Sequence, residues 1–295
     1  MVPDPFLLPD RSITGEGGAV TMGALTRDPA IDGRPALATL YGQFERLVEA
    51  GWTRTLLTSQ HDASGEALPV FAYQSAGSVD LVLIGGIHGR EPAGTLALAG
   101  QVERLCDLGR TRAILLMPQL NPWGYLHHQR YGPSGQSVSD SDHLLGRAEA
   151  PACPEADAIT AFVMDRAGIQ PGATVLDLHE DPVYEAPDYV FEGQGSYLYV
   201  TGAGALNHAT TRRIIHCLTG CALPLILEGV TRFHERLNGG VIVDTEDGSI
   251  DELLARRKAC SPVITTELVL KAKDSPNLAT RIATYRAVID AFFAP

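Results

Sequence analysis

The sequence predicts an α/β fold in which a mostly parallel sheet is covered by helices on both faces. Short, continuously apolar runs at 81–87, 113–117 and 263–270 are typical of strands that are buried on both sides. Helical patterns alternate with these runs, and this order favours parallel strands joined by helical crossovers. No internal repeat or linker divides the 295 residues, so a single domain is expected.

The first predicted elements follow a loop-rich lead-in, residues 1–35, which has no periodicity and is rich in Gly, Pro and Asp. Apolar residues recur at helical spacing through 36–50, and Gly51 follows as a C-cap. A helix is also expected over 92–108, because Pro92 suits a first helical turn. The strands predicted in this half of the chain are 53–59, 68–74, 81–87 and 113–117.

The second half continues the alternation after a loop-like stretch, 118–150, which contains several Gly, Ser and Asp residues. Strand 263–270 is rich in β-branched residues, and the closing helix over 279–293 is amphipathic. The other elements predicted here are helices at 154–167 and 206–218 and strands at 174–178 and 189–200.

Charge and composition exclude several classes of function. The chain carries 35 acidic against 23 basic residues, a net charge of −12, whereas a nucleic-acid binder needs a basic surface. The sequence has no apolar run long enough for a membrane helix and no basic region typical of a signal peptide. Five cysteines without a Cys-x-x-Cys pair predict reduced thiols in a cytoplasmic protein. The oligomeric state is not indicated.

A histidine and a glutamate three residues apart follow the strand predicted at 81–87. His88 and Glu91 can place an imidazole nitrogen and a carboxylate oxygen on one ion, and nearby glycines allow a tight turn. Ligands of open α/β sheets lie at the carboxyl ends of strands, where this pair falls. The spacing is common by chance, so the motif alone indicates little.

A second histidine, His179, directly follows the strand predicted at 174–178. Together with His88 and Glu91 it makes a set of three ligands that leaves a fourth position open, as in a catalytic zinc site. We therefore expect one zinc ion per chain, with no second metal beside it. Asp177 is either structural or orients this site from behind the ligands.

A carboxylate, Glu267, interrupts the apolar strand predicted at 263–270. Burying such a group without a partner is costly, but near a metal ion it can take a proton from water and pass it to a leaving amine. The alternative is that Glu267 pairs with a buried arginine or lies at a sheet edge.

Four motifs, GGIHGREPAG, NPWGY, DLHED and TTELVL, occur in this order over roughly residues 50–290. They resemble the zinc carboxypeptidase family and its relatives, the succinylglutamate desuccinylases and aspartoacylases. The resemblance implies a single α/β/α domain over 36–295 with a mixed, mostly parallel sheet. It also implies zinc bound by His88, Glu91 and His179, with Glu267 as general base and acid.

The peptidase branch of this family is favoured by the Asn-Pro-Trp-Gly-Tyr turn, which places Asn121 and Tyr125 among the substrate-binding candidates. Deacylase relatives share the Asn-Pro pair but less often the full turn. Arg130 lies where carboxypeptidases hold an arginine against the developing oxyanion, so the resemblance implies that role for it. The alternative is a surface arginine in a loop.

The chain departs from the family where carboxypeptidases carry an Asn-Arg pair that grips the substrate's terminal carboxylate. The matching stretch contains Asp140 and Asp142, and no arginine lies between Arg130 and Arg147. Either one of these two arginines takes over the carboxylate, or the substrate is held differently. The two aspartates are further substrate-binding candidates and favour a positively charged substrate, unless they only cap a solvated loop.

The predicted function is zinc-dependent hydrolysis of an amide bond in a peptide or small amide. A metallocarboxypeptidase that removes a C-terminal residue is the first interpretation, with a basic residue as the hypothesised preference. The alternatives are an N-acyl amino acid deacylase of the desuccinylase or aspartoacylase type and a non-catalytic zinc-binding protein of the same fold. The intact Glu267 argues against a non-catalytic protein, which has no use for a buried carboxylate.

Overall fold

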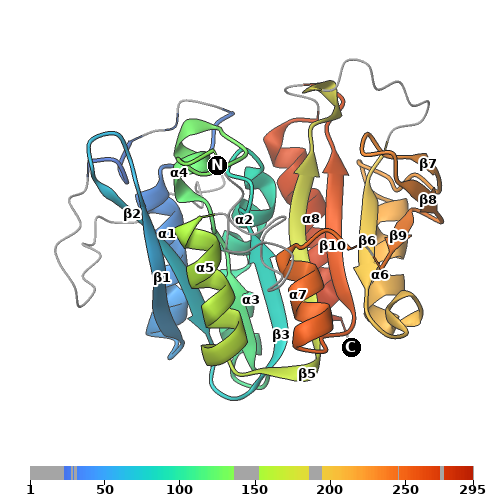
Figure 1. Ribbon diagram of the computed structural model, residues 1–295, viewed down its shortest axis with the longest axis horizontal. Coiled ribbons are helices and arrows are strands. Elements are labelled where there is room, and N and C mark those ends of the chain that lie inside the picture. Colours follow the sequence, from blue (N-terminus) through green and yellow to red (C-terminus); the bar gives the residue numbers. More distant parts are fainter. Residues whose placement is uncertain are drawn as a thin grey trace, which may run out of the picture.

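The computed structural model describes residues 23–27, 29, 32–135, 153–185, 195–244, 246–272 and 276–294. Within these residues a single ten-stranded sheet runs through the molecule (Figure 1). In sheet order its strands are β1 (Thr53–His61), β2 (Ala67–Gln74), β4 (Ile114–Met117), β3 (Val79–Gly85), β5 (Ile169–Asp181), β10 (Val263–Val269), β6 (Tyr197–Thr201), β9 (Val241–Val243), β8 (Arg236–Asn238) and β7 (Glu228–Val230).

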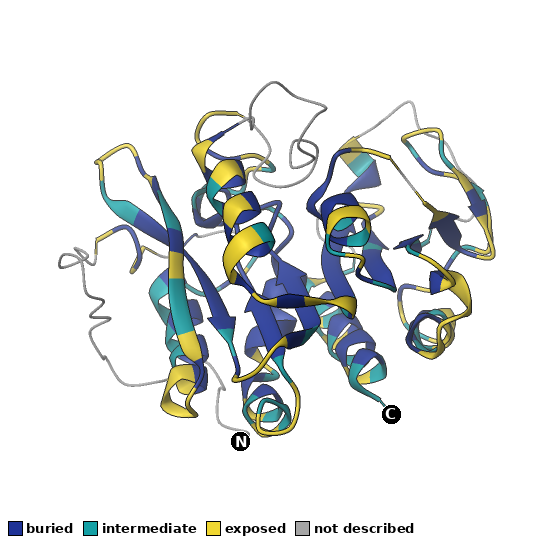
Figure 2. Cartoon of the chain, turned by 60° about the horizontal axis from the view of Figure 1, so that its bottom comes forward, coloured by how far each residue is buried: buried dark blue, intermediate teal, exposed yellow. Residues whose placement is uncertain are grey.

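The sheet is mixed, as predicted, and its parallel part is the centre. Strands β4, β3, β5 and β10 run parallel to one another, so their carboxyl ends meet at one edge. The flanks are largely antiparallel: β1 and β2 on one side, and β6 and the short strands beyond it on the other. Residues of β3, β4 and β10 are nearly all buried, which explains their largely apolar sequences (Figure 2).

Helices cover both faces of the sheet. One face packs against α1 (Leu37–Glu49), α2 (Pro92–Ala99), α3 (Val102–Leu108), α6 (Ala209–Thr219) and α8 (Leu278–Phe293). The other face packs against α5 (Pro154–Ala161) and α7 (Ile250–Arg257), which lie in front of the sheet in Figure 1. Each layer of helices packs against one face of the sheet and forms a separate apolar core with it, so the architecture is the expected α/β/α sandwich.

Several elements differ from the sequence expectation. The helix predicted over 92–108 is two helices, because Gly100 ends α2 and α3 begins after Gln101. Gly100 lies against Arg286, where an added Cβ would come within 2.2 Å of the guanidinium. The helix predicted over 154–167 ends as α5 at Ala161 and continues as a short π-helical turn.

Other elements were not predicted. The loop-like stretch contains a short helix, α4 (Pro122–His127), which begins just beyond the carboxyl end of β4. Helix α7 follows a Ser-x-x-Glu sequence, in which Ser249 accepts from the backbone N–H of Glu252 and Glu252 accepts from that of Gly248. This capping pattern was a sequence signal for α7. Among the described residues, no helix is long and apolar enough to cross a bilayer.

Candidate metal centre

The three strands that carry the predicted site residues are neighbours in the sheet. Strand β5 lies between β3 and β10, so the loop after β3 and the ends of β5 and β10 share one edge. In the register between β5 and β10, His179 is directly opposite Glu267. The sequence prediction that these strand ends converge is therefore confirmed.

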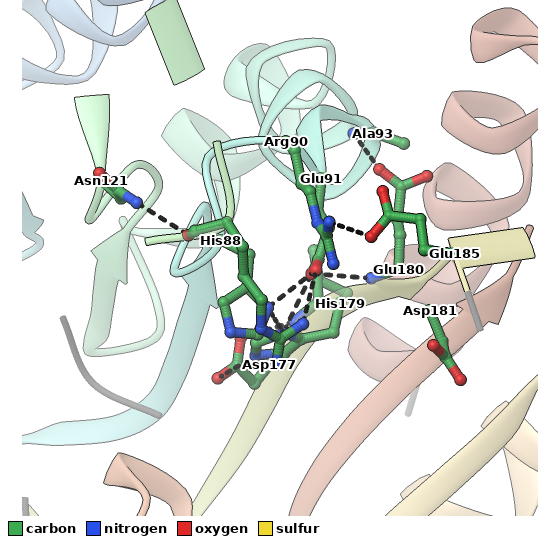
Figure 3. Close-up of polar contacts among 12 residues, drawn as sticks. His88, Arg90, Glu91, Ala93, Asn121, Asp177, His179, Glu180, Asp181 and Glu185 are labelled. Atoms are coloured by element: carbon green, nitrogen blue, oxygen red, sulfur yellow. Dashed lines mark hydrogen bonds and ion pairs between the residues drawn. The ribbon is translucent and has the colours of Figure 1, made fainter. Parts of the chain in front are cut away.

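His88, Glu91 and His179 are buried and point toward one another (Figure 3). The Nδ1 atom of His88 lies 2.9 Å from Oε1 of Glu91, and the Nδ1 atom of His179 lies 3.2 Å from Oε2 of the same carboxylate. The two Nδ1 atoms are 3.1 Å apart. Within the described part of the chain, this is the one group of three metal-ligating side chains whose donor atoms lie close together.

These distances fit a divalent ion. Two nitrogens at about 2.05 Å from a tetrahedral zinc are separated by roughly 3.3 Å, close to the observed spacing of the imidazoles. Two imidazoles and one carboxylate are also the donor types that zinc prefers when one position stays open. The Nε2 atom of His179 lies 3.4 Å from Oδ2 of the buried Asp177, which orients the ring so that Nδ1 faces the other ligands.

The electrostatics of the ligands favour a cation between them. Burial raises the pKa of Glu91, but the neighbouring His88 and His179 outweigh this effect and hold that pKa well below its usual range. Burial lowers the pKa of His179, whereas Asp177, Glu91 and Glu267 raise it, and the net pKa is well above that of a free histidine. A cation binding here therefore competes with a proton on His179.

Glu267 faces the ligand group from β10. Burial raises its pKa well above the usual range; His179 and Arg130 oppose this, while Glu91 and Asp181 add to it. No arginine ion pair of Glu267 occurs among the described residues, so the alternative role as partner of a buried arginine receives no support there. A carboxylate with a raised pKa beside a candidate metal site has the properties of a general base.

Arg130 also reaches the site, with Nη1 3.4 Å from Oε1 of Glu91. Its backbone carbonyl accepts a hydrogen bond of 3.0 Å from Nδ2 of Asn121, whose Oδ1 in turn accepts from the backbone N–H of Gly124. Asn121 is fully buried and both of its polar atoms are used in these contacts. The structure thus places Asn121 under Arg130, where it fixes the backbone of that arginine.

The other substrate-binding candidates are Tyr125, Asp140 and Asp142. Tyr125 is fully buried, and its hydroxyl donates to the carbonyl of Pro35 at 2.8 Å. It lies beneath the site rather than at its surface. Asp140 and Asp142 lie outside the described residues.

The acidic residues that follow His179 point in opposite directions, as strand alternation requires. Glu180 lies on the face covered by α2 and α8, where it pairs with Arg281 and accepts from the backbone N–H of Ala93. Asp181 is on the same face as His179 and is labelled to one side of the ligands in Figure 3. Glu180 therefore does not face the site.

Sequence analysis missed a buried arginine from the lead-in, Arg34. Its Nη1 donates to the carbonyls of Gly89 and Tyr125 at 2.9 and 3.0 Å, and its other nitrogens pair with Asp32 and Nδ1 of His128. The guanidinium thus joins the loop after β3, which carries His88 and Glu91, to α4. Gly89 packs so closely on α4 that an added Cβ would lie 2.0 Å from the backbone of Gly124.

Replacing Arg34 with methionine should destabilise the protein by about 3–5 kcal/mol, because it leaves buried acceptors without their donor. Urea unfolding of the metal-free protein measures this loss. Arg27→Met is the matched control: its side chain is 53% exposed and its guanidinium lies 3.5 Å from Asp62, so its loss should leave the urea midpoint close to that of the wild-type protein. Equal midpoints for the two variants would contradict the structural role of Arg34.

Comparisons with known proteins show which solved structures share this fold. No protein-family model and no curated protein sequence matches the chain. Among solved structures, a candidate metallopeptidase from Shewanella amazonensis SB2B superposes with a TM-score of 0.70 at 18% identity, covering 87% of this chain and 91% of that one. A counterpart from Shewanella baltica OS155 gives a TM-score of 0.71 at 19% identity, covering 87% and 91%.

A metallo-carboxypeptidase from Pseudomonas aeruginosa matches with a TM-score of 0.56 at 17% identity, covering 87% of this chain and 68% of that one. At these identities the likeness establishes the fold alone. The expectation of a carboxypeptidase-like α/β/α fold, drawn from four short motifs, is confirmed: the chain shares its architecture with metallopeptidases and metallo-carboxypeptidases.

Proposed function

We propose that the protein is a zinc-dependent hydrolase that cleaves an amide bond next to a free chain end, in the manner of a metallocarboxypeptidase. The observation that carries this proposal is the placement of Glu267 opposite His179, beside the ligand group formed with His88 and Glu91. Arg130 contacts the same ligand group through the carboxylate of Glu91. A set of ligands, a base and a fixed cation at one sheet edge is what amide hydrolysis requires.

Each of these residues has a distinct task. A zinc ion held by the three ligands supplies Lewis acidity to the substrate carbonyl and lowers the pKa of water. Glu267 accepts a proton from the attacking water as its oxygen bonds to the carbonyl carbon, and delivers that proton to the nitrogen as the C–N bond breaks. The products are a carboxylic acid and an amine, so one water is consumed and no other reactant is needed.

Arg130 stabilises the negative charge that develops on the carbonyl oxygen. Its guanidinium is a permanent cation and sits within 3.4 Å of Glu91, at the metal centre itself. Asn121 holds the Arg130 backbone, so the charge is fixed before the substrate arrives. We assign Asn121 and Tyr125 to this supporting role in the proposal, not to direct contact with the substrate.

The test is a matched set of substrates offered to the zinc-loaded protein. N-blocked tripeptides that end in Lys, Leu or Glu are compared with their C-terminal amides and with N-acetyl and N-succinyl amino acids. A carboxypeptidase cleaves the free acids at least about tenfold faster than the amides. The preference for a basic end rests on Asp140 and Asp142, so the Lys peptide tests that part.

Three outcomes are distinguishable. Cleavage of the N-acyl amino acids alone would replace the peptidase by the deacylase. No cleavage of any compound, despite a bound zinc ion, would favour a non-catalytic zinc protein. Equal rates for the three peptide ends would leave the peptidase standing and remove the basic preference.

A further inference from the structure

Several described arginines near the metal centre are paired with protein groups. They are Arg34 with Asp32 and two carbonyls, Arg90 with Glu185, Arg130 with Glu91, and Arg281 with Glu180. Arg147 lies outside the described residues. Arg232 is also paired, with Asp181, and it comes from a part of the chain in which no functional residue was expected.

Arg232 sits in the turn between β7 and β8. The turn is closed by backbone hydrogen bonds from Thr231 to Glu235 and from His234 to Thr231, at 2.8 and 2.9 Å. The Arg232 Nε atom lies 2.6 Å from Oδ1 of Asp181, and the guanidinium stacks on the ring of Phe233. Among the described residues, its two terminal nitrogens have no recorded partner.

This guanidinium is attached to the same strand face as the metal ligand. Asp181 follows His179 by two residues on β5, which corresponds to about 6.6 Å along the strand. The second oxygen of Asp181 accepts a hydrogen bond of 2.9 Å from Tyr197, and Tyr197 lies directly opposite Glu267 in the register of β6 and β10. Asp181 therefore anchors Arg232 beside both the ligand group and the candidate base.

We propose that Arg232 binds the free carboxylate of the substrate, with Asp181 holding the guanidinium in position. This inference rests on the proposed function, because it names the residue that recognises the chain end. The Arg232 side chain is 13% exposed, and Asp181 beneath it is 2% exposed, so the cation caps a buried acid and remains accessible from outside.

The chemistry of the pair supports this role. Guanidinium carries five N–H donors in a fixed plane; the Nε atom makes the ion-pair contact with Asp181, and the two terminal nitrogens carry the other four N–H groups. Two such donors match the two oxygens of a carboxylate. The charges of Asp181 and Arg232 cancel each other. A substrate carboxylate can therefore accept two charge-assisted hydrogen bonds from Arg232 without net repulsion from Asp181.

The test compares two uncleavable ligands in calorimetric titrations of the zinc-loaded protein. Both are N-blocked dipeptide analogues ending in leucine, with the scissile amide replaced by CH₂–NH; one ends in a carboxylate and the other in a carboxamide. The wild-type protein should bind the acid roughly 10- to 100-fold more tightly. Arg232→Met should lose this preference and bind the carboxamide within about threefold of wild type.

Three further variants make the result specific. Arg232→Met combined with Asp181→Asn removes both charges, so it avoids leaving a buried unpaired acid if the single variant folds poorly. Arg236→Met, on β8 of the same hairpin and exposed, is the matched control and should keep the full preference. A preference that persists without Arg232, or that vanishes instead in Arg147→Met, would overturn the proposal.

Binding and turnover separate this inference from the proposed function. If peptides are cleaved and Arg232→Met raises KM for the free acids without changing kcat, both stand. If peptides are cleaved and neither KM nor binding responds, the inference fails and the peptidase remains. If nothing is cleaved but the acid preference depends on Arg232, the carboxylate site stands without the peptidase.

Discussion

Glu267→Gln should keep its metal and its fold but lose about 10²- to 10⁴-fold in kcat/KM. The amide is nearly the same size as the carboxylate but cannot accept a proton from water. In the wild-type protein, burial and the negative charges of Glu91 and Asp181 raise the Glu267 pKa. The base works only when it is deprotonated, so activity should rise with pH on the acidic side of the pH profile. The midpoint of this rise should lie above the ordinary glutamate pKa of about 4.3.

The control is Glu185→Gln, which removes a negative charge at Arg90, next to the metal-binding loop, without touching the proposed base (Figure 3). It should change kcat/KM by less than about threefold and retain the acidic limb. Initial rates over a pH series and metal content by mass spectrometry measure both effects. Turnover near the wild-type level in Glu267→Gln, with one zinc still bound, would make Glu267 a structural residue.

His179→Ala should abolish both metal binding and activity, and a chelator should do the same to the wild-type protein. Only two ligands, His88 and Glu91, remain in the variant, too few for a zinc site. Binding of zinc at 100 times its dissociation constant should stabilise the folded wild-type protein by about 2.7 kcal/mol, and this gain should be absent in the variant. Thermal unfolding with and without zinc measures it.

The stoichiometry and the pH dependence sharpen this result. One zinc per chain is expected, and two equivalents bound at the centre would contradict the single site. Asp177 contributes to the raised pKa of His179, so zinc affinity should fall as pH falls and protons compete for that nitrogen. Asp177→Asn should weaken zinc binding about 10- to 100-fold while leaving one equivalent per chain. Competition titration with a chromophoric chelator at several pH values measures these affinities.

The candidate metal site could be predicted from sequence because its signals are local. An apolar run that stops at His88 or at His179 marks the end of a buried strand, and parallel strand ends meet at one edge. Strand alternation also separates Asp181, on the face of His179, from Glu180 on the other face, but this signal was not used in the sequence prediction.

Other parts of the site had no such signal. Arg34 is a single arginine in an irregular segment, and its contacts with Gly89 and Tyr125 span 55 and 91 residues of sequence. Arg232 lies in the turn between β7 and β8, two strands of three residues that are too short to show a periodic pattern. Long-range contacts of this kind depend on the assembled fold, so composition and spacing do not reveal them.

The order of strands in the sheet also sets the order in which the parts of the proposed site come together during folding. β3, β5 and β10 are adjacent in the sheet, yet 83 residues of chain lie between β3 and β5 and 81 lie between β5 and β10. Closing such loops is slow compared with forming local helices. During synthesis β5 is complete well before β10 emerges, and α8, whose Tyr285 donates to the His179 carbonyl, follows later still. The nascent chain thus contains the candidate metal ligands before it contains the proposed base, so the proposed metal site can form before the proposed catalytic group is in place.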